Sequence, residues 1–388
     1  MTTSKKSRER KQKSPQVKKI VRILLQVLLM VAIFAALLWY VGSTVPANFK
    51  PGESTILKGV DYIYNTILTI KVEYLLLAFL MYFGINLLFT VRLRRVLSKD
   101  GVKTSFGKTL LAQYAGMLTS DVTPGRSGYI LTPVYLRDQN VPTSKGLSSV
   151  LGIQTIEFLV KVIGGIGAVI FLVEVVPAQN WSHFGTLAGI NVGFVLAGLG
   201  IGLMLTGALL LAAFTWSQRA ISLFDRIANS RFLKRFTGGL MGKLEEYKDS
   251  AQKTHKAIPE ISLLTFACWI LKGFEWYFLG LALGITLNSN LGIAWLAFFL
   301  IHPLVTALAF VPITPAGAGF QEFGIVGILT FLFGIAAAPA AAFALLSRGL
   351  LIFEDLAGVP QIAKSTSSLF FSDRKSSEPT ESEPPKPF

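Results

Sequence analysis

The chain has 388 residues, of which 52% are hydrophobic and only 15% are charged, and its formal net charge is +15. Soluble globular domains carry about 25% charged residues, so this composition excludes an ordinary soluble protein. The basic residues cluster beside apolar runs and no nucleic-acid-binding pattern accompanies them, so we expect no nucleic-acid partner. The single cysteine, Cys268, excludes an intrachain disulfide and a cysteine-based zinc site.

The N-terminal segment predicts a basic cytoplasmic tail followed by a retained membrane anchor. Residues 1–22 contain nine Lys or Arg and one Glu, and the apolar run Ile20–Gly42 is longer than the apolar part of a signal peptide. We expect residues 1–19 to be disordered. Because basic segments mark the cytoplasmic side and attract anionic lipid headgroups, we expect both termini in the cytoplasm of a multi-pass protein of the cell membrane.

The remaining apolar runs predict an all-α polytopic membrane protein with about six to eight transmembrane helices. Residues 217–258 form an amphipathic cytoplasmic segment that we expect on the membrane surface. The membrane domain covers residues 20–362, and residues 363–388 form a tail that we expect to be disordered. The predicted spans after the anchor lie at about 73–91, 147–173, 185–214, 259–284, 291–311 and 337–362.

The first unusual feature is an apolar segment interrupted by "VTPGRSGY", residues 122–129, which we name the first break. The apolar pieces on either side are too short to cross a membrane. Pro124, Gly125 and Gly128 disrupt a helix, and irregular backbone is tolerated at membrane depth only where protein or a wet cavity covers it. We therefore expect a re-entrant segment here.

A second break, "ITPAGAGF" at residues 313–320, has the same Thr-Pro start, and its Thr314 lies 191 positions after Thr123. Matched interruptions in two halves of a membrane protein are typical of an inverted repeat with a site near the midplane. The likeness is short, so an inverted repeat and a chance similarity are both open interpretations. The residues that shape the second break are expected to be Pro312, Pro315, Gly317 and Gly319.

Ionisable residues within the predicted spans are few, and such residues face a partner or a wet cavity. Glu157 and Lys161 have i,i+4 spacing, so they form either a structural ion pair or part of a site. Lys272 and Glu275 lie between two tryptophans, a pattern that favours the membrane interface. Glu354 and Asp355 can mark the cytoplasmic end of the last span, and the arginines at 92, 94 and 95 are expected at the headgroup level.

Arg126 and Glu322 each adjoin a break, where backbone N–H and C=O groups are freed. A broken helix end beside an arginine suits an anion, because the helix dipole, free donors and guanidinium act together. Phosphate is the obvious anion in a lipid membrane. The alternatives are a headgroup anchor for Arg126 and a water-facing charge for Glu322. No nucleophile–base motif, nucleotide-binding motif or metal motif is present, so we expect no enzyme activity, cofactor or metal.

The second break and its surroundings resemble the UPF0104 family of flippase-like membrane proteins, which includes the transmembrane region of lysylphosphatidylglycerol synthases. The resemblance covers most of residues 20–362. The first break departs from the family pattern, because Tyr129 stands where an acidic residue is frequent. On the next span, Glu157 precedes Phe158 where Glu-Arg is frequent, and the nearby cation is Lys161. The matching residues are Pro124, Arg126, Gly128, Pro312, Thr314, Pro315, Gly317, Gly319, Glu322 and Arg348.

The resemblance implies a protein that binds and translocates a phospholipid or a lipid-linked glycan through a polar cavity between two broken helices. Phosphate contacts are then expected from Arg126, Lys161 and Arg348, with Glu157 and Glu322 balancing the charge and Thr314 completing the substrate-binding set. An alternative is a membrane factor or transferase in polyprenyl-phosphate sugar transfer. A third reading is a scaffold that recruits a soluble synthase through residues 217–258 and the C-terminal tail, with a separate glycosyltransferase or aminoacyl transferase as the expected partner.

Overall fold

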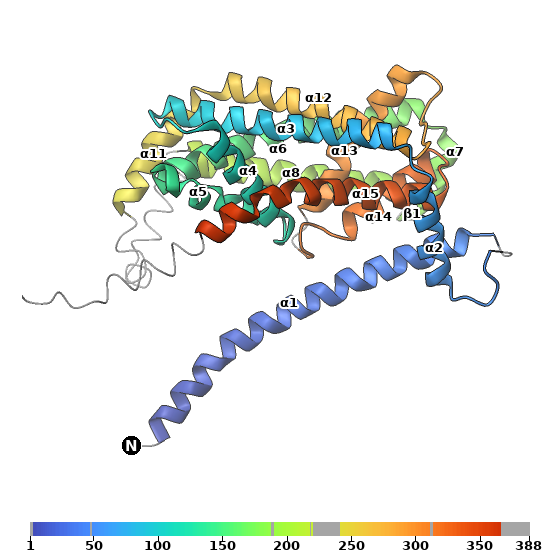
Figure 1. Ribbon diagram of the computed structural model, residues 1–388, viewed down its shortest axis with the longest axis horizontal. Coiled ribbons are helices and arrows are strands. Elements are labelled where there is room, and N and C mark those ends of the chain that lie inside the picture. The colour runs from blue at the N-terminus through green and yellow to red at the C-terminus, as the bar shows by residue number, and fades with distance from the viewer. Residues whose placement is uncertain are drawn as a thin grey trace, which may run out of the picture.

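The structure, a computed structural model, describes residues 3–46, 49–187, 190–217, 219, 241–310 and 313–365. Most of its long helices run along one axis and form a bundle, from which α1 extends (Figure 1). The long helices are α1 (Thr3–Thr44), α3 (Val72–Lys99), α6 (Thr143–Val175), α8 (Val192–Trp216), α12 (Ile258–Ala282), α13 (Leu291–Ala309) and α15 (Ala337–Asp355).

Shorter elements connect these helices and form the two breaks. A pair of two-residue strands, β1 and β2, is antiparallel and lies between α6 and α8. The shorter elements are α2 (Thr55–Leu68), α4 (Phe106–Asp121), η1 (Ser127–Leu131), α5 (Thr132–Tyr135), η2 (Arg137–Gln139), α7 (Ala178–Trp181), η3 (Ser182–Phe184), β1 (Thr186–Leu187), β2 (Ile190–Asn191), α11 (Met241–His255), α14 (Phe320–Gly327), the π-helix η4 (Ile328–Leu332) and η5 (Leu356–Gly358).

The helices confirm the predicted all-α polytopic membrane fold. Within the described residues, five helical segments are long and apolar enough to cross a membrane, or six if the pair α11 and α12, bent by 68°, is one broken span. At 16 residues α4 is not among them, whereas α13, which precedes the second break, is. The five segments are Leu24–Thr44, Val72–Lys99, Thr143–Val175, Val192–Trp216 and Leu291–Ala309.

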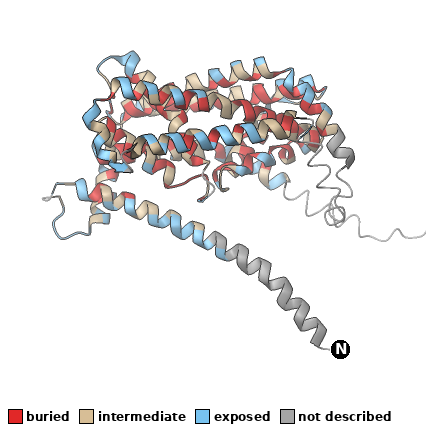
Figure 2. Cartoon of the chain, turned by 180° about the vertical axis from the view of Figure 1, so that it is seen from behind, coloured by how far each residue is buried: buried red, intermediate tan, exposed pale blue. Residues whose placement is uncertain are grey.

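The outer faces of the bundle carry many exposed residues (Figure 2), and a large number of these are apolar. Ile163, Leu199, Leu210 and Leu263 are each at least 65% exposed, and they come from α6, α8 and α12. Monomeric soluble proteins rarely expose apolar surface of this extent. In a bilayer, lipid chains cover such faces, which explains why the sequence places leucine and isoleucine there.

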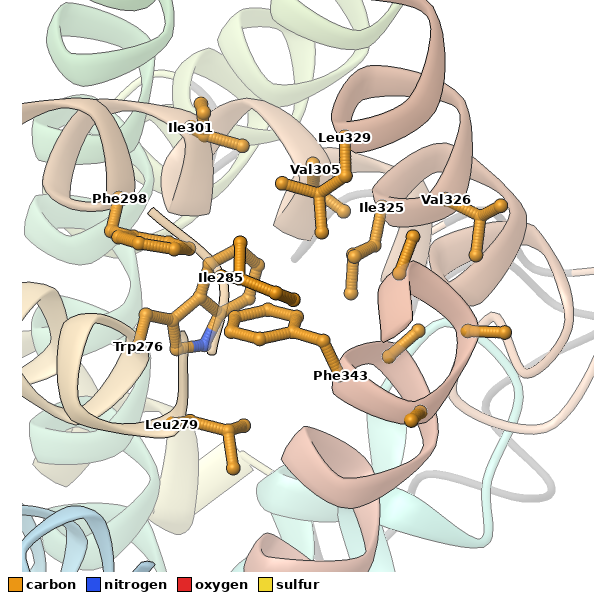
Figure 3. Close-up of a cluster of buried hydrophobic side chains, with 14 of the residues drawn as sticks. Trp276, Leu279, Ile285, Phe298, Ile301, Val305, Ile325, Val326, Leu329 and Phe343 are labelled. Atoms are coloured by element: carbon orange, nitrogen blue, oxygen red, sulfur yellow. The ribbon is translucent and has the colours of Figure 1, made fainter. Parts of the chain in front are cut away.

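The core gathers around three aromatic rings, those of Trp276, Phe298 and Phe343 (Figure 3). The ring of Phe343 lies 5.3 Å from that of Trp276 and 5.5 Å from that of Phe298. Phe343 belongs to the alanine-rich start of α15, in which Ala338 and residues 340–342 are completely buried. Small residues allow helix backbones to approach closely, so this part of α15 inserts into the bundle.

Helices α3 and α12 form an antiparallel pair that positions one wall of the site. The backbone N–H of Lys71 donates to the carbonyl of Ala282 at one end, over 2.9 Å. At the other end, Lys99 and Glu260 form an ion pair of 2.9 Å. Both helices therefore keep a fixed register along their length.

Three predicted segments fall partly outside the described residues. Residues 3–19 form the first part of α1, which differs from the disorder expected there; Lys, Arg and Gln are good helix formers and extend the helix of the apolar anchor. Of the amphipathic segment 217–258, the structure describes 217, 219 and the helix α11 onward. Most of the C-terminal tail lies outside the described residues, as does Pro312 of the second break motif.

Candidate functional site

The two Thr-Pro breaks lie directly against each other. Pro124 of the first break and Pro315 of the second form an antiparallel backbone bridge. The N–H of Ala316 donates to the carbonyl of Thr123 over 2.9 Å. In Figure 1, the loops that follow α4 and α13 come together near the middle of the bundle. Two segments that lie 191 positions apart in sequence thus meet in one place.

Both breaks have the same backbone shape. After each proline, two residues have positive φ: Gly125 (61°) and Arg126 (55°) in the first break, Ala316 (45°) and Gly317 (65°) in the second. In each break, the N–H of the third residue after the proline donates to the proline carbonyl. The distance is 3.3 Å in the first break and 2.8 Å in the second. Paired positive φ values define a type I′ turn, and a non-glycine residue adopts them at an energetic cost.

The two threonine side chains hold these turns from within. The hydroxyl of Thr123 donates to the carbonyl of Thr119 over 2.9 Å and accepts from the N–H of Gly128 over 2.7 Å. Thr314 is fully buried, and its hydroxyl donates to the carbonyl of Ala318 over 2.9 Å. Thr314, predicted as substrate-binding, therefore uses its hydroxyl to shape the second break.

Glycine is required where each break packs against the preceding helix. A Cβ on Gly128 would lie 2.2 Å from the carbonyl oxygen of Thr119 in α4. A Cβ on Gly317 would lie 2.5 Å from the backbone of Leu308 and Ala309 in α13. Real Cβ atoms do not approach backbone atoms so closely, so the Gly residues identified in the sequence serve the close packing of the breaks.

Glu322 and Arg348 fasten the second break rather than line a cavity. Glu322 is 1% exposed, and its Oε2 accepts from the N–H of Gly319 over 2.6 Å, which caps α14. Its Oε1 pairs with Nε of Arg348 on α15. A second nitrogen of Arg348 donates to the side chain of Gln321 over 3.2 Å. The structure thus brings these two predicted site residues together, one layer behind the cavity described next.

A central cavity lies between the helices beside the first break, and the empty space there, open solvent at its mouth included, is about 850 Å³. Helices α3, α4, α6, α12, α13, α14 and α15 contribute to its wall. It contains three of the predicted site residues, namely Arg126, Glu157 and Lys161. Its lining consists of Tyr82, Ile85, Phe89, Arg92, Met117, Asp121, Arg126, Glu157, Val160, Lys161, Thr265, Cys268, Trp269, Lys272, Trp276, His302, Thr306, Gln321, Ser347 and Leu351.

A carboxylate shared by two cations forms one side of the central cavity. Glu157 accepts from Lys161 over 2.7 Å, as its i,i+4 spacing predicts, and from Arg92 over 3.1 Å. Arg92 is only 1% exposed, so the prediction that it lies at the headgroup level is wrong. The signal for its true position was the spacing of Tyr82, Ile85, Phe89 and Arg92, which puts all four on one face of α3.

Two further ion pairs involve cations that line the central cavity. Arg126 pairs with Asp121 at the end of α4 over 3.4 Å. Lys272 pairs with Glu275 over 2.6 Å, with side chains 12% and 0% exposed, so the prediction that this pair lies at the membrane interface is wrong. The two tryptophans that suggested an interface, Trp269 and Trp276, line the central cavity instead.

Several nitrogen groups at the central cavity have no partner of their own within the described residues. Nε of Arg92 and Nε of Arg126 lack a hydrogen-bond acceptor, and Nδ1 of His302 lacks a hydrogen-bond partner. A smaller adjoining cavity shares Arg92, Arg126, Glu157 and Lys161 and adds Tyr129, whose hydroxyl donates to Gln113 over 3.0 Å. Tyr129, the departure at the first break, therefore lies beside the same charged residues.

The charges and donors of the central cavity suit an anion with oxygen acceptors. Four cations line it, Arg92, Arg126, Lys161 and Lys272, and three carboxylates pair with them, those of Asp121, Glu157 and Glu275. The Nε groups of Arg92 and Arg126 are themselves buried and have no hydrogen-bond partner within the described residues. No group of three or more His, Cys, Asp or Glu side chains in the described part of the chain is arranged to hold a metal ion.

Comparison with known proteins supplies the family. No protein of curated function matches the chain. The family model for the lysylphosphatidylglycerol synthase transmembrane region matches residues 23–354, which include both breaks and every residue of the central cavity. The match covers most of the chain, so this multi-pass membrane protein belongs to the lysylphosphatidylglycerol synthase transmembrane-region family.

Proposed function

We propose that the protein binds a lipid with an anionic headgroup and moves that headgroup across the membrane through the central cavity. The observation that carries the proposal is the central cavity beside the contact of the two breaks, because its wall carries four cationic side chains, those of Arg92, Arg126, Lys161 and Lys272. Arginine binds phosphate oxygens through its planar fork of donors. A phosphate-bearing headgroup therefore matches the chemistry of the wall.

The surroundings of the cavity fit a lipid better than a free anion. Exposed apolar faces of the bundle contact lipid chains, while the polar residues stay inside. A headgroup in the cavity thus leaves its acyl chains in the bilayer.

The proposed movement needs no covalent step by this chain. The basic segments between the helices would hold anionic lipids near the entrance by charge. Among the residues taken from the sequence, Arg126 and Lys161 would contact the headgroup, and Glu157 would balance them. Glu322 and Arg348 would act indirectly, by holding the second break in place.

The test uses proteoliposomes with a headgroup-labelled phosphatidylglycerol or lipid-linked sugar phosphate, in which a quencher reports how fast label crosses the bilayer. Arg126→Ala should slow the movement about tenfold or more, since a charge-assisted contact contributes roughly 1.5–3 kcal/mol. Arg137→Ala is the matched control, because Arg137 is exposed, and it should behave as wild type. Background movement in the wild-type protein, or equal rates in both variants, would contradict the proposal.

A further inference from the structure

The lining of the central cavity divides by helix into a charged part and a neutral part. The four cations in the lining, and the two carboxylates in it, all belong to α3, α4, the first break, α6 and α12. Helices α13, α14 and α15 contribute no lysine, arginine, aspartate or glutamate to the lining. Their lining residues, which we name the neutral part, are His302, Thr306, Gln321, Ser347 and Leu351.

Gln321 lies in the neutral part, in the first turn of α14 directly after the second break, and its side-chain amide has a fixed orientation. The residue is 7% exposed, and its Oε1 accepts from a guanidinium nitrogen of Arg348 over 3.2 Å. Within the described residues, this is the only hydrogen bond of the Gln321 side chain. A guanidinium group has donors only, so the amide atom that faces it must be the oxygen. The NH₂ group of Gln321 therefore points away from Arg348.

Arg348 is itself held in place by the second break. Its Nε pairs with Glu322, and the nitrogen that donates to Gln321 also donates to the carbonyl of Ala316 over 3.5 Å. Glu322 in turn accepts from the N–H of Gly319 over 2.6 Å. These contacts lie behind the cavity, and through Arg348 they set the direction of one amide group in the lining.

The NH₂ group of Gln321 is an unused donor at the central cavity. Gln321 lines the cavity, and its Nε2 is accessible rather than enclosed by protein. The two hydroxyl groups of the neutral part differ, because Thr306 and Ser347 donate to carbonyls of their own helices, over 2.7 Å and 2.9 Å. Gln321 therefore offers a neutral N–H donor to a molecule in the cavity, and no acceptor in the described part of the chain competes for it.

We propose that Gln321 is a specificity-determining residue that donates to a hydroxyl oxygen of the headgroup, so that the cavity prefers anionic headgroups with hydroxyl groups. The inference rests on the proposed function, in which the phosphate binds the cations of the charged part. A neutral amide N–H suits an uncharged oxygen acceptor. An ammonium group has donors only, and it finds no carboxylate in the neutral part. The geometry therefore favours a phosphodiester that ends in a glycerol or a sugar over one that ends in an amine.

The first measurement compares two lipids of equal charge on the wild-type protein in detergent micelles. Phosphatidylglycerol and phosphatidylmethanol carry the same phosphodiester charge, but only phosphatidylglycerol has headgroup hydroxyl groups. Phosphatidylglycerol should bind about two- to tenfold more tightly, which corresponds to one neutral hydrogen bond. Equal or weaker binding of phosphatidylglycerol, with both lipids bound more tightly than phosphatidylcholine, would overturn the hydroxyl preference and leave the proposed function standing. Binding of neither lipid above the level of phosphatidylcholine would overturn the proposed function itself.

The second measurement assigns the preference to Gln321. Gln321→Met keeps the length of the side chain and removes the NH₂ group, while Arg348 keeps its pair with Glu322. The variant should bind phosphatidylglycerol only as tightly as phosphatidylmethanol, and its unchanged affinity for phosphatidylmethanol shows that the fold and phosphate binding are intact. Gln252→Met is the matched control, because Gln252 is exposed on α11, and it should keep the preference. A preference that survives in Gln321→Met, or an equal loss of both lipids, would overturn the role of Gln321.

Discussion

Arg92 carries more of the site's architecture than any residue taken from the sequence. Its guanidinium donates to the hydroxyl of Thr265 over 2.8 Å and to Glu157 over 3.1 Å, and it lies over the ring of Phe89. The side chain thus connects α3, α12 and α6. The sequence could not place it, because Arg92 belongs to a basic cluster of cytoplasmic type, and only the face of α3 that it shares with Tyr82 distinguishes it from its neighbours.

Arg92→Leu should destabilise the protein by about 3 kcal/mol, because removing one partner of a buried ion pair leaves an uncompensated charge. The remaining Lys161 contact of Glu157 limits the loss. Arg95→Leu is the control, since Arg95 is exposed and surface substitutions change stability by about 0.5 kcal/mol or less. Thermal unfolding in detergent compares the two. An equal, small effect of both substitutions would show that Arg92 is not buried in an ion pair.

At the scale of the helices and breaks, sequence patterns predict some parts of the structure and miss others. Apolar runs predicted five of the spans, because burial in lipid acts on every residue of a helix. The predicted span 259–284 qualifies only together with α11, and α15, in the predicted span 337–362, is not among the candidate spans. The Thr-Pro pattern predicted both breaks, and the structure shows that they meet. The breaks contact each other through the backbone, from the N–H of Ala316 to the carbonyl of Thr123. No side-chain pattern in the sequence could therefore predict this contact. Likewise, nothing in the order of residues distinguishes an Arg348 that clamps Glu322 from one that binds phosphate.

The shape of the second break predicts opposite effects of two neighbouring substitutions. Gly317→Ala should destabilise the protein by about 2 kcal/mol or more, since its Cβ meets the backbone of α13 and its φ is positive. Ala316→Gly should stabilise it by up to about 1 kcal/mol, because glycine adopts the φ of 45° without strain. Unfolding curves of the two variants should therefore lie on opposite sides of wild type. Shifts in the same direction would contradict the turn geometry.

In the whole molecule, the first and second breaks contact each other within the helix bundle, and we call this contact the junction. The central cavity lies beside the junction. The family match covers both segments and supports one shared architecture for residues 23–354. Behind the cavity, α14 and α15 are locked by Glu322 and Arg348, whereas the first break carries the residues that face the cavity. Under the proposed function, a headgroup that moves past the junction would require the two breaks to shift relative to each other.

A disulfide across the junction tests this account most directly. Residues paired across antiparallel backbone lie about 4.5–5.5 Å apart at Cα, within the range that a disulfide spans, so Pro124→Cys with Pro315→Cys in a Cys268→Ala background should cross-link on oxidation. In proteoliposomes, the reduced double variant should move headgroup-labelled lipid and the oxidised form should not, with recovery after reduction. Single-cysteine variants should respond to neither treatment. Equal lipid movement by the oxidised and reduced double variant, with the cross-link verified, would contradict passage of the headgroup at the junction of the two breaks.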